Sequence, residues 1–270
     1  MTLQCGIVGL PNVGKSTIFN ALTAAGIAAE NYPFCTIEPN TGVVPVPDAR
    51  IKAIDDIVHA QRVLPVTLEF VDIAGLVAGA SKGEGLGNQF LGHIRSTDAI
   101  VHVVRCFEDT DVVHVEGSID PLRDIETIET ELALADLESI EKRTDRARKN
   151  AKTAAKGTRE ELAFFEGLYA HLSEGKMART FDVSDEMETI FHDCHLITAK
   201  PVLYVANVDE SALADGNAFT KQVESFAESE GNRVVRLCGK VESELAELDD
   251  EEKCEFLEDL GVSEPGLDRL

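Results

Sequence analysis

Apolar residues along the chain follow two kinds of pattern, which predict strands and helices in different regions. A continuous apolar run such as 99–107 is typical of a strand buried on both faces of a parallel sheet, because helices cover both sides of it. Other residues, such as 18–22, have helical spacing. Strand-like runs occupy 5–8, 43–46, 66–72, 99–107, 202–207 and 234–239. The pattern predicts an α/β fold.

A different pattern fills the stretch from about 124 to 200. Its apolar residues recur at helical spacing from Ile125 to Ile140, and no strand-like run appears before 201. Gly157 predicts a turn between two antiparallel helices, since glycine interrupts a helical pattern. We therefore predict one α/β domain formed by 1–124 and 201–270, interrupted by a helical insertion at 125–200.

Residues 9–17 fill the pattern G-x-x-x-x-G-K-S at every defined position, between the first strand and a helix. Gly9 and Gly14 let successive N–H groups point inward, and the helix N-terminus adds its positive dipole end. Such a match arises by chance roughly once in a hundred chains of this length. We predict a nucleotide-phosphate site, in which Lys15 reaches the β- and γ-phosphates and Ser16 ligates Mg²⁺. The predicted nucleotide contacts here are Asn12, Val13, Gly14, Lys15, Ser16 and Thr17.

Two further segments are candidates for contact with the metal and the γ-phosphate. Thr36 lies in a proline-punctuated loop where P-loop switch proteins sense the γ-phosphate; it is a candidate second Mg²⁺ ligand or an ordinary turn threonine. Asp72 ends the run 66–72 and begins a D-x-x-G motif that closes with Gly75. We expect Asp72 to hold Mg²⁺ through water and the Gly75 N–H to contact the γ-phosphate. Leu76 stands where many nucleotide switches carry the glutamine that orients the attacking water, so water positioning must come from elsewhere.

A histidine, His114, lies in the acidic loop that follows the run 99–107. The carboxyl end of a central strand is where open α/β sheets bind their ligands. His114 is therefore either close to the ligand or an ordinary solvated loop histidine, and its position alone leaves both open.

The base-reading motif N-K-x-D of guanine-specific proteins appears here in altered form as Asn207-Val208-Asp209-Glu210. Asn207 is kept, whereas Val208 replaces the lysine that packs over the base and Glu210 replaces the aspartate that binds guanine. Guanine selection should be weakened, because a site not built to pair the 2-amino group gains little from it. The loop at Cys238, after the last strand, is predicted to face the base with its backbone.

The net charge of the 270-residue chain is −24, so nucleic-acid binding requires a local basic patch, and we expect no DNA sequence specificity. Such a cluster occupies 142–159, where eight Lys and Arg residues face Asp145 alone. It is either a solvated helix face or a contact for RNA phosphates, and the two readings are about equally favoured. Its candidate RNA contacts are Arg146, Arg148, Lys149 and Lys152.

Six scattered cysteines form no C-x-x-C pair and no zinc spacing, and no apolar run approaches the length that spans a bilayer. The N-terminus leads directly into the first strand. These features predict a cytoplasmic protein with reduced thiols and no membrane contact.

With these motifs in hand, the chain resembles the YchF subfamily of Obg-related P-loop proteins over essentially all of its residues. The resemblance depends on 9–17, on 31–42, on the segment from Asp72 to Leu76 and on the altered N-x-x-E motif. It implies a Ras-like, doubly wound G domain with an antiparallel, coiled-coil-like helical insertion. Family members are expected to continue into a C-terminal TGS domain, and the sequence given ends at Leu270, about where that domain should begin.

The resemblance also implies function. ATP is expected to be preferred over GTP, Mg²⁺ to be held by Ser16 and Thr36, and the large ribosomal subunit to be a partner, with ribosomal RNA as a further candidate contact. The catalytic histidine role falls on His114, and Asn12 matches an asparagine that helps to seat K⁺ in related proteins.

We therefore expect a Mg²⁺-dependent ATPase that hydrolyses the β–γ bond by in-line attack of water, with Lys15 and His114 as catalytic residues. One alternative keeps the fold but makes the protein a GTPase switch of the Obg type. Another is a nucleotide-gated module that binds RNA or the ribosome with negligible hydrolysis.

Overall fold

The computed structural model describes residues 2–25, 41–73, 86–109, 118–152 and 157–270. By its internal contacts the chain divides into two compact units. The first comprises 1–75, 97–124 and 202–270, and the second comprises 76–96 and 125–201. The domain boundaries expected from the sequence stay a prediction; these units differ from them in grouping 76–96 with the helical insertion.

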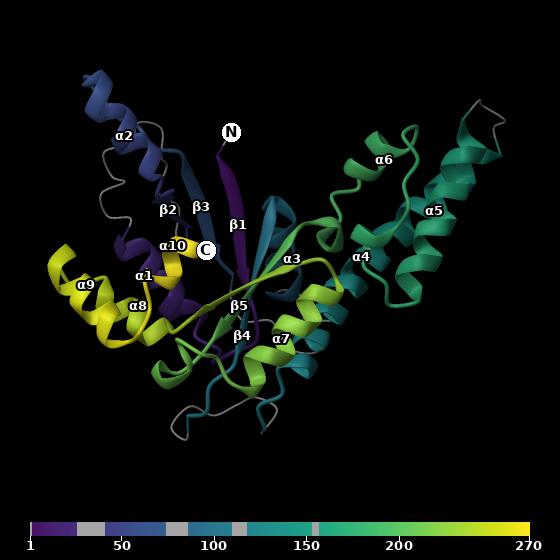
Figure 1. Cartoon of the computed structure of the whole chain (residues 1–270). Coiled ribbons are helices and arrows are strands. Elements are labelled where there is room, and N and C mark those ends of the chain that lie inside the picture. The colour runs from purple at the N-terminus through teal and green to yellow at the C-terminus, as the bar shows by residue number, and fades with distance from the viewer. Residues whose placement is uncertain (1, 26–40, 74–85, 110–117, 153–156) are drawn as a thin grey trace. The chain divides into compact units, whose positions relative to one another are not determined.

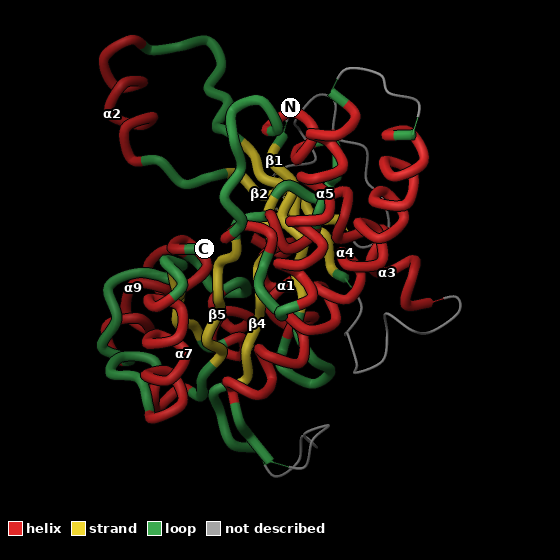
Figure 2. The backbone as a smooth tube through the Cα atoms, turned by 90° about the vertical axis from the view of Figure 1, so that its right-hand side faces the viewer, coloured by secondary structure: helices red, strands yellow, loops and turns green. Residues whose placement is uncertain are grey.

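The first unit is built on a six-stranded sheet in the order β2-β3-β1-β4-β5-β6 (Figures 1 and 2). All neighbouring strands are parallel except the antiparallel pair β2 and β3. The parallel register places Arg105 beside Asn207, so the carboxyl ends of β4 and β5 lie next to each other. The strands are β1 (Leu3–Val8), β2 (Thr41–Pro45), β3 (Thr67–Asp72), β4 (Ala99–Arg105), β5 (Val202–Asn207) and β6 (Arg233–Leu237).

The continuous apolar runs form the centre of this sheet, as their pattern predicted. Ile7 and Val8 of β1, Val103 of β4 and Val205 of β5 are each 1 % exposed or less. Helices cover both faces of these central strands, which is why the runs do not alternate with polar residues. The expectation of an α/β P-loop fold with a helical insertion is confirmed.

In the described part of the first unit, six α-helices accompany the sheet. Two of them begin at capping boxes, at Asn217 before α7 and at Asp249 before α9, which explains their sharp starts. Helix α1 packs against α8, whereas α7 lies on the opposite face of the sheet (Figure 1). Helix α2 has no buried residue and stands away from the sheet (Figures 1 and 2). The helices are α1 (Lys15–Ala25), α2 (Ala49–Val58), α7 (Ala218–Ser229), α8 (Gly239–Leu245), α9 (Asp250–Asp259) and α10 (Gly266–Arg269).

The second unit is helical. Its main elements are α3 (Leu86–Ser96), the part of α4 (Pro121–Ala151) from residue 125 onward, α5 (Thr158–Ser173) and α6 (Glu188–His192). Gly157, in the left-handed conformation, precedes α5 at the predicted turn. Helices α4 and α5 run antiparallel, because Ile140 shares a core cluster with Leu172 while Arg148 pairs with Glu166 farther along.

A buried carboxylate anchors the end of this helical unit. Asp136 of α4 is 0 % exposed and accepts hydrogen bonds from the N–H groups of Ile197 (3.0 Å) and Thr198 (2.7 Å) and from the Thr198 hydroxyl (2.8 Å). Arg95 of α3 lies 3.7 Å from the same carboxylate. A buried charge persists only when it is paired in this way, so Asp136 joins α4 to the short helix at Ile197–Ala199.

Candidate nucleotide site

At two positions in the loop between β1 and α1, the backbone has a conformation that only glycine adopts without strain. Gly9 has φ of 152° and Gly14 has φ of 95°. A Cβ atom on Gly9 would lie 2.5 Å from the carbonyl oxygen of Val103, and one on Gly14 would collide with the Asn207 amide nitrogen. The two glycines of the motif are therefore required both by φ and by the close approach of neighbouring strands.

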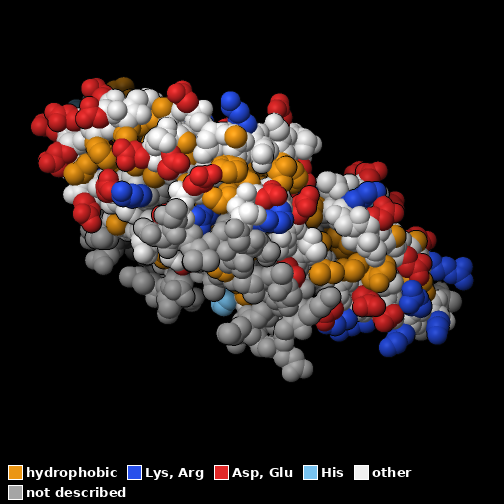
Figure 3. All heavy atoms as spheres, turned by 90° about the horizontal axis from the view of Figure 1, so that it is seen from below, with side chains coloured by type: hydrophobic (Ala, Val, Ile, Leu, Met, Phe, Trp, Pro, Cys, Tyr) orange, Lys and Arg blue, Asp and Glu red, His pale blue; other side chains and the backbone are white. Residues whose placement is uncertain are grey.

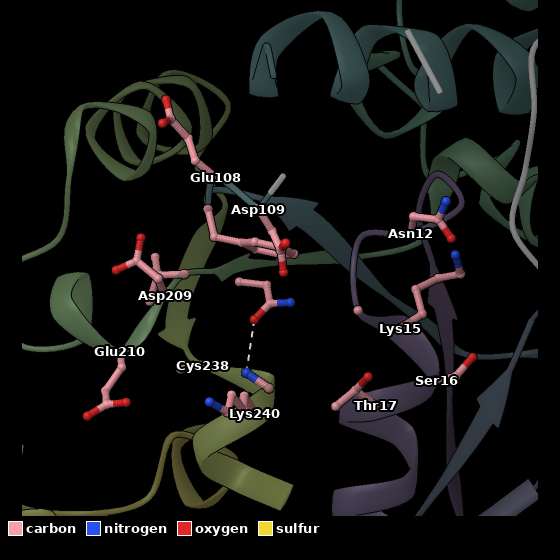
Figure 4. Close-up of a pocket in the computed structure, with 15 residues that line it drawn as sticks. Asn12, Lys15, Ser16, Thr17, Glu108, Asp109, Asp209, Glu210, Cys238 and Lys240 are labelled. Carbon is pink, nitrogen blue, oxygen red and sulfur yellow. Dashed lines mark hydrogen bonds between the residues drawn. The ribbon is translucent and has the colours of Figure 1, made fainter. Parts of the chain in front are cut away.

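Lys15 is buried inside this loop, with 7 % of its surface exposed. Its Nζ donates a hydrogen bond to the carbonyl oxygen of Leu10 (2.7 Å), and it lies beside Asn12 (Figure 4). Burial lowers the pKa of Lys15 to about 8, and the negative charge of Asp72 opposes that shift. A buried amino group in a glycine loop at a helix N-terminus is suited to bind an anion, whose negative charge would raise the pKa of Lys15 again.

Asp72, at the end of β3, lies close to the start of α1. Burial raises the pKa of its carboxyl group, and Lys15 and a hydrogen bond with Ser16 oppose the rise. Its Oδ1 atom is buried without a hydrogen-bond partner among the described residues. An orphaned carboxylate oxygen next to a serine hydroxyl fits a Mg²⁺ ion that keeps several of its waters. No group of three or more His, Cys, Asp and Glu side chains able to hold a metal occurs in the described part of the chain.

Asn207 joins the phosphate loop to the loop after β6. Its Nδ2 donates to the carbonyl oxygen of Val13 (2.8 Å), and its Oδ1 accepts from the N–H of Gly239 (2.9 Å; Figure 4). The side chain is 4 % exposed. The asparagine of the altered motif thus holds two loops together, a role that the motif alone did not indicate.

These loops enclose a cavity of about 560 Å³. Of the predicted residues, Asn12, Gly14, Lys15, Ser16, Thr17, Asn207, Val208, Glu210 and Cys238 line it. The Val13 side chain is buried, and its carbonyl oxygen accepts the hydrogen bond from Asn207. Figure 4 shows Glu108, Asp109, Asp209 and Glu210 across the cavity from the phosphate loop.

Six residues that line the cavity were not predicted from the sequence: Phe107, Glu108, Asp109, Asp209, Gly239 and Lys240. The first three come one residue after the end of β4, and the carboxyl ends of the central strands are where ligands bind in this class of sheet. The same rule that favoured His114 could therefore have indicated Phe107. Thr36, Gly75 and His114 lie outside the described residues, so their roles stay predictions.

The candidate RNA contacts lie at the end of α4, where Arg146, Arg148 and Lys149 are exposed on its last two turns and Lys152 is exposed just after it. Figure 3 shows Lys and Arg side chains gathered at this end of the helical unit. Arg148 pairs with Asp145 (3.0 Å) and Glu166 (3.1 Å), so part of the positive charge is neutralised within the unit. For Arg146, Lys149 and Lys152, no ion pair is seen among the described residues.

Comparisons with known proteins agree on one family. A family model described as 50S ribosome-binding GTPase matches residues 4–142. The ribosome-binding ATPase YchF of Pasteurella multocida is 58 % identical over 271 residues, which cover 100 % of this chain and 74 % of that protein. The protein of the same name from Bacillus subtilis is 51 % identical over 272 residues, with the same coverage.

A solved structure is also similar to this chain. The Schizosaccharomyces pombe YchF GTPase matches with a TM-score of 0.83 and 38 % identity, covering 97 % of this chain and 72 % of that one. Among the described residues, no helix is both long and apolar enough to cross a membrane.

Proposed function

The chain belongs to the YchF family of P-loop NTPases, and from this membership we propose that it is a Mg²⁺-dependent ATPase that binds the ribosome. ATP is cleaved at the β–γ bond by in-line attack of water. We place the protein in the cytoplasm, where ribosomes offer it a partner.

The observation that carries the proposal is the buried Lys15 amino group inside the glycine loop, with Ser16 and the orphaned Asp72 oxygen beside it. Lys15 and the loop N–H groups hold the terminal phosphates and stabilise the charge that builds on them during hydrolysis. Ser16 and, through water, Asp72 would hold a Mg²⁺ ion, which would supply positive charge to the β- and γ-phosphates.

Replacement of Lys15 tests this core of the proposal. Lys15→Met should weaken Mg-ATP binding at least about 100-fold, because a buried charge-assisted contact to phosphate is lost. Lys52→Met, on the exposed helix α2, is the matched control and should bind ATP like the wild type. Equal ATP affinity in Lys15→Met and the control, measured by calorimetry, would rule out the loop as the phosphate site.

The remaining chemical roles follow from the resemblance to the family. Thr36 is the second protein ligand to Mg²⁺, the Gly75 N–H contacts the γ-phosphate, and His114 orients the attacking water in place of the glutamine that Leu76 replaces. His114→Ala should abolish turnover and leave nucleotide affinity unchanged. Full turnover in that variant would remove His114 from the mechanism. Asn12, on the phosphate loop, is assigned to a K⁺ ion, so turnover should be higher in K⁺ than in Na⁺.

Preference for ATP over GTP rests on the altered base motif. Val208 is 2 % exposed and offers no cation above the base. The Asn207 amide already forms hydrogen bonds with the backbone of Val13 and Gly239. Titration with Mg-ATP and Mg-GTP in the same buffer compares the two affinities directly. ATP is expected to bind more tightly.

A GTPase switch is the second candidate, because the family model and the S. pombe structure are both described as GTPases. This candidate keeps the phosphate site and changes only the base that is read. A clear GTP advantage in the same titration would establish it in place of the ATPase.

Ribosome binding is proposed to use the basic cluster at the end of α4. Charge reversal at Arg146 and Lys149 should weaken association with the large subunit and lower its salt dependence, because fewer phosphate counterions are released. Lys221→Glu, on the exposed side of α7, is the matched control. Unchanged salt dependence would show that the cluster is only solvated. Ribosome binding without measurable ATP turnover would instead support a nucleotide-gated binding module.

A further inference from the structure

Arg105, the last residue of β4, is a charged side chain with only 1 % of its surface exposed. A buried guanidinium must find acceptors inside the protein. Its Nε donates to the carbonyl oxygen of Phe107 (3.2 Å) and one Nη donates to that of Asp109 (3.2 Å). Arg105 thus binds the main chain of the segment that follows its own strand.

The same guanidinium lies against the ring of Phe107, with its central carbon 4.5 Å from the ring centroid. A cation over an aromatic face is attracted by the negative face of the ring, more strongly where water is excluded. Phe107 is half-buried and lines the nucleotide cavity. Arg105 therefore holds both the ring and the backbone of one wall of this cavity.

A second anchor holds the segment from the side of α7. The Asn217 side chain, which caps α7, donates its Nδ2 to the carbonyl oxygen of Cys106 (2.7 Å). With its backbone held at Cys106, Phe107 and Asp109, the segment has a defined course from β4 into the cavity.

The cavity has two halves that are built by different parts of the chain. The phosphate loop supplies Lys15 and Ser16, and the opposite half is formed by 107–109, 207–210 and 238–240. An aromatic ring in a half-buried wall is suited to pack on a purine base. The contacts of Arg105 described above involve that half and not the phosphate loop.

We propose that Arg105 is a positioning residue for the nucleotide base: it fixes the Phe107 ring and the 107–109 backbone as the wall against which the base packs. The inference rests on the proposed nucleotide-binding function and adds a residue that acts on base affinity alone. The proposal makes one specific prediction. Loss of Arg105 should weaken ligands that carry a base and spare ligands that consist of phosphates only.

The test compares Mg-ATP with Mg-tripolyphosphate, which presents the phosphate chain without a base, by calorimetry on the full chain. Arg105→Met should raise the Kd of ATP about tenfold, as expected for the loss of an aromatic packing contact, and change that of tripolyphosphate less than about twofold. Arg236→Met is the matched control, because Arg236 of β6 also binds two backbone carbonyls, of Leu213 and Ala214, away from the cavity. It should leave both affinities unchanged.

Three results would overturn the proposal: unchanged ATP affinity in Arg105→Met, an equal loss for both ligands, or an additive loss in the double variant with Phe107→Leu. If Arg105 acts through Phe107, the double variant should be no weaker than the weaker single variant. Should Arg105→Met not fold, Arg105→Lys carries the same comparison, because lysine keeps the charge but cannot present the fixed fork of donors. A wild-type protein that binds neither ligand would refute the proposed function itself, which is a different outcome.

Discussion

Replacement of Asn207 by alanine should destabilise the first unit and weaken ATP binding together. The side chain makes two buried hydrogen bonds, to the Val13 carbonyl oxygen (2.8 Å) and from the Gly239 N–H (2.9 Å). Its removal leaves both backbone groups without these partners, which lowers the free energy of unfolding by about 1–3 kcal/mol for each group. Because the adjoining cavity lets water reach part of the gap, we expect about 3 kcal/mol less free energy of unfolding.

Urea unfolding followed by circular dichroism measures this loss, and calorimetry measures the ATP affinity. Asn232→Ala is the matched control, because that side chain makes one exposed hydrogen bond, to Glu230, and should cost no more than about 0.5 kcal/mol. An Asn207→Ala protein as stable as this control would refute the reasoning that the amide holds the two loops together.

Two further predictions concern buried charges. Because burial lowers the pKa of Lys15 to about 8, the unfolded chain binds more protons than the folded chain from about pH 8 to its ordinary value of 10.5. The free energy of unfolding should therefore rise over that window by about 3 kcal/mol more in the wild type than in Lys15→Met; parallel pH profiles in urea unfolding would contradict it. Asp136→Ala should cost the helical unit about 3 kcal/mol, since two N–H groups and a hydroxyl lose their acceptor. The same assay should show a change below about 0.5 kcal/mol for the exposed Asp185→Ala, and equal values for the two variants would contradict the role of Asp136 as an anchor.

Several structural features could be predicted from the sequence because they depend on neighbouring residues. The continuous apolar run of β4 indicated a strand buried on both faces, and helical spacing from Ile125 indicated the long helix α4. The orientation of β2 could not be predicted in this way. It pairs antiparallel with β3 although the other neighbouring strands are parallel, and a five-residue run has the same pattern in either direction.

The two halves of the candidate site also differ in how far the sequence predicts them. By itself, the sequence determined the phosphate half, because Gly9, Gly14, Lys15 and Ser16 lie within one short motif and its conformation follows from a strand, two glycines with positive φ and a helix N-terminus. The altered motif at 207–210 and the loop at Cys238 also indicated part of the base half, but only the tertiary structure decided that the 107–109 segment completes it. Residues 107–109, 207–210 and 238–240 meet because β4, β5 and β6 pair in parallel, which brings their carboxyl ends to one edge of the sheet across the long insertion. The contact of the Arg105 guanidinium with the Phe107 ring is local, but no periodicity along the chain indicates it.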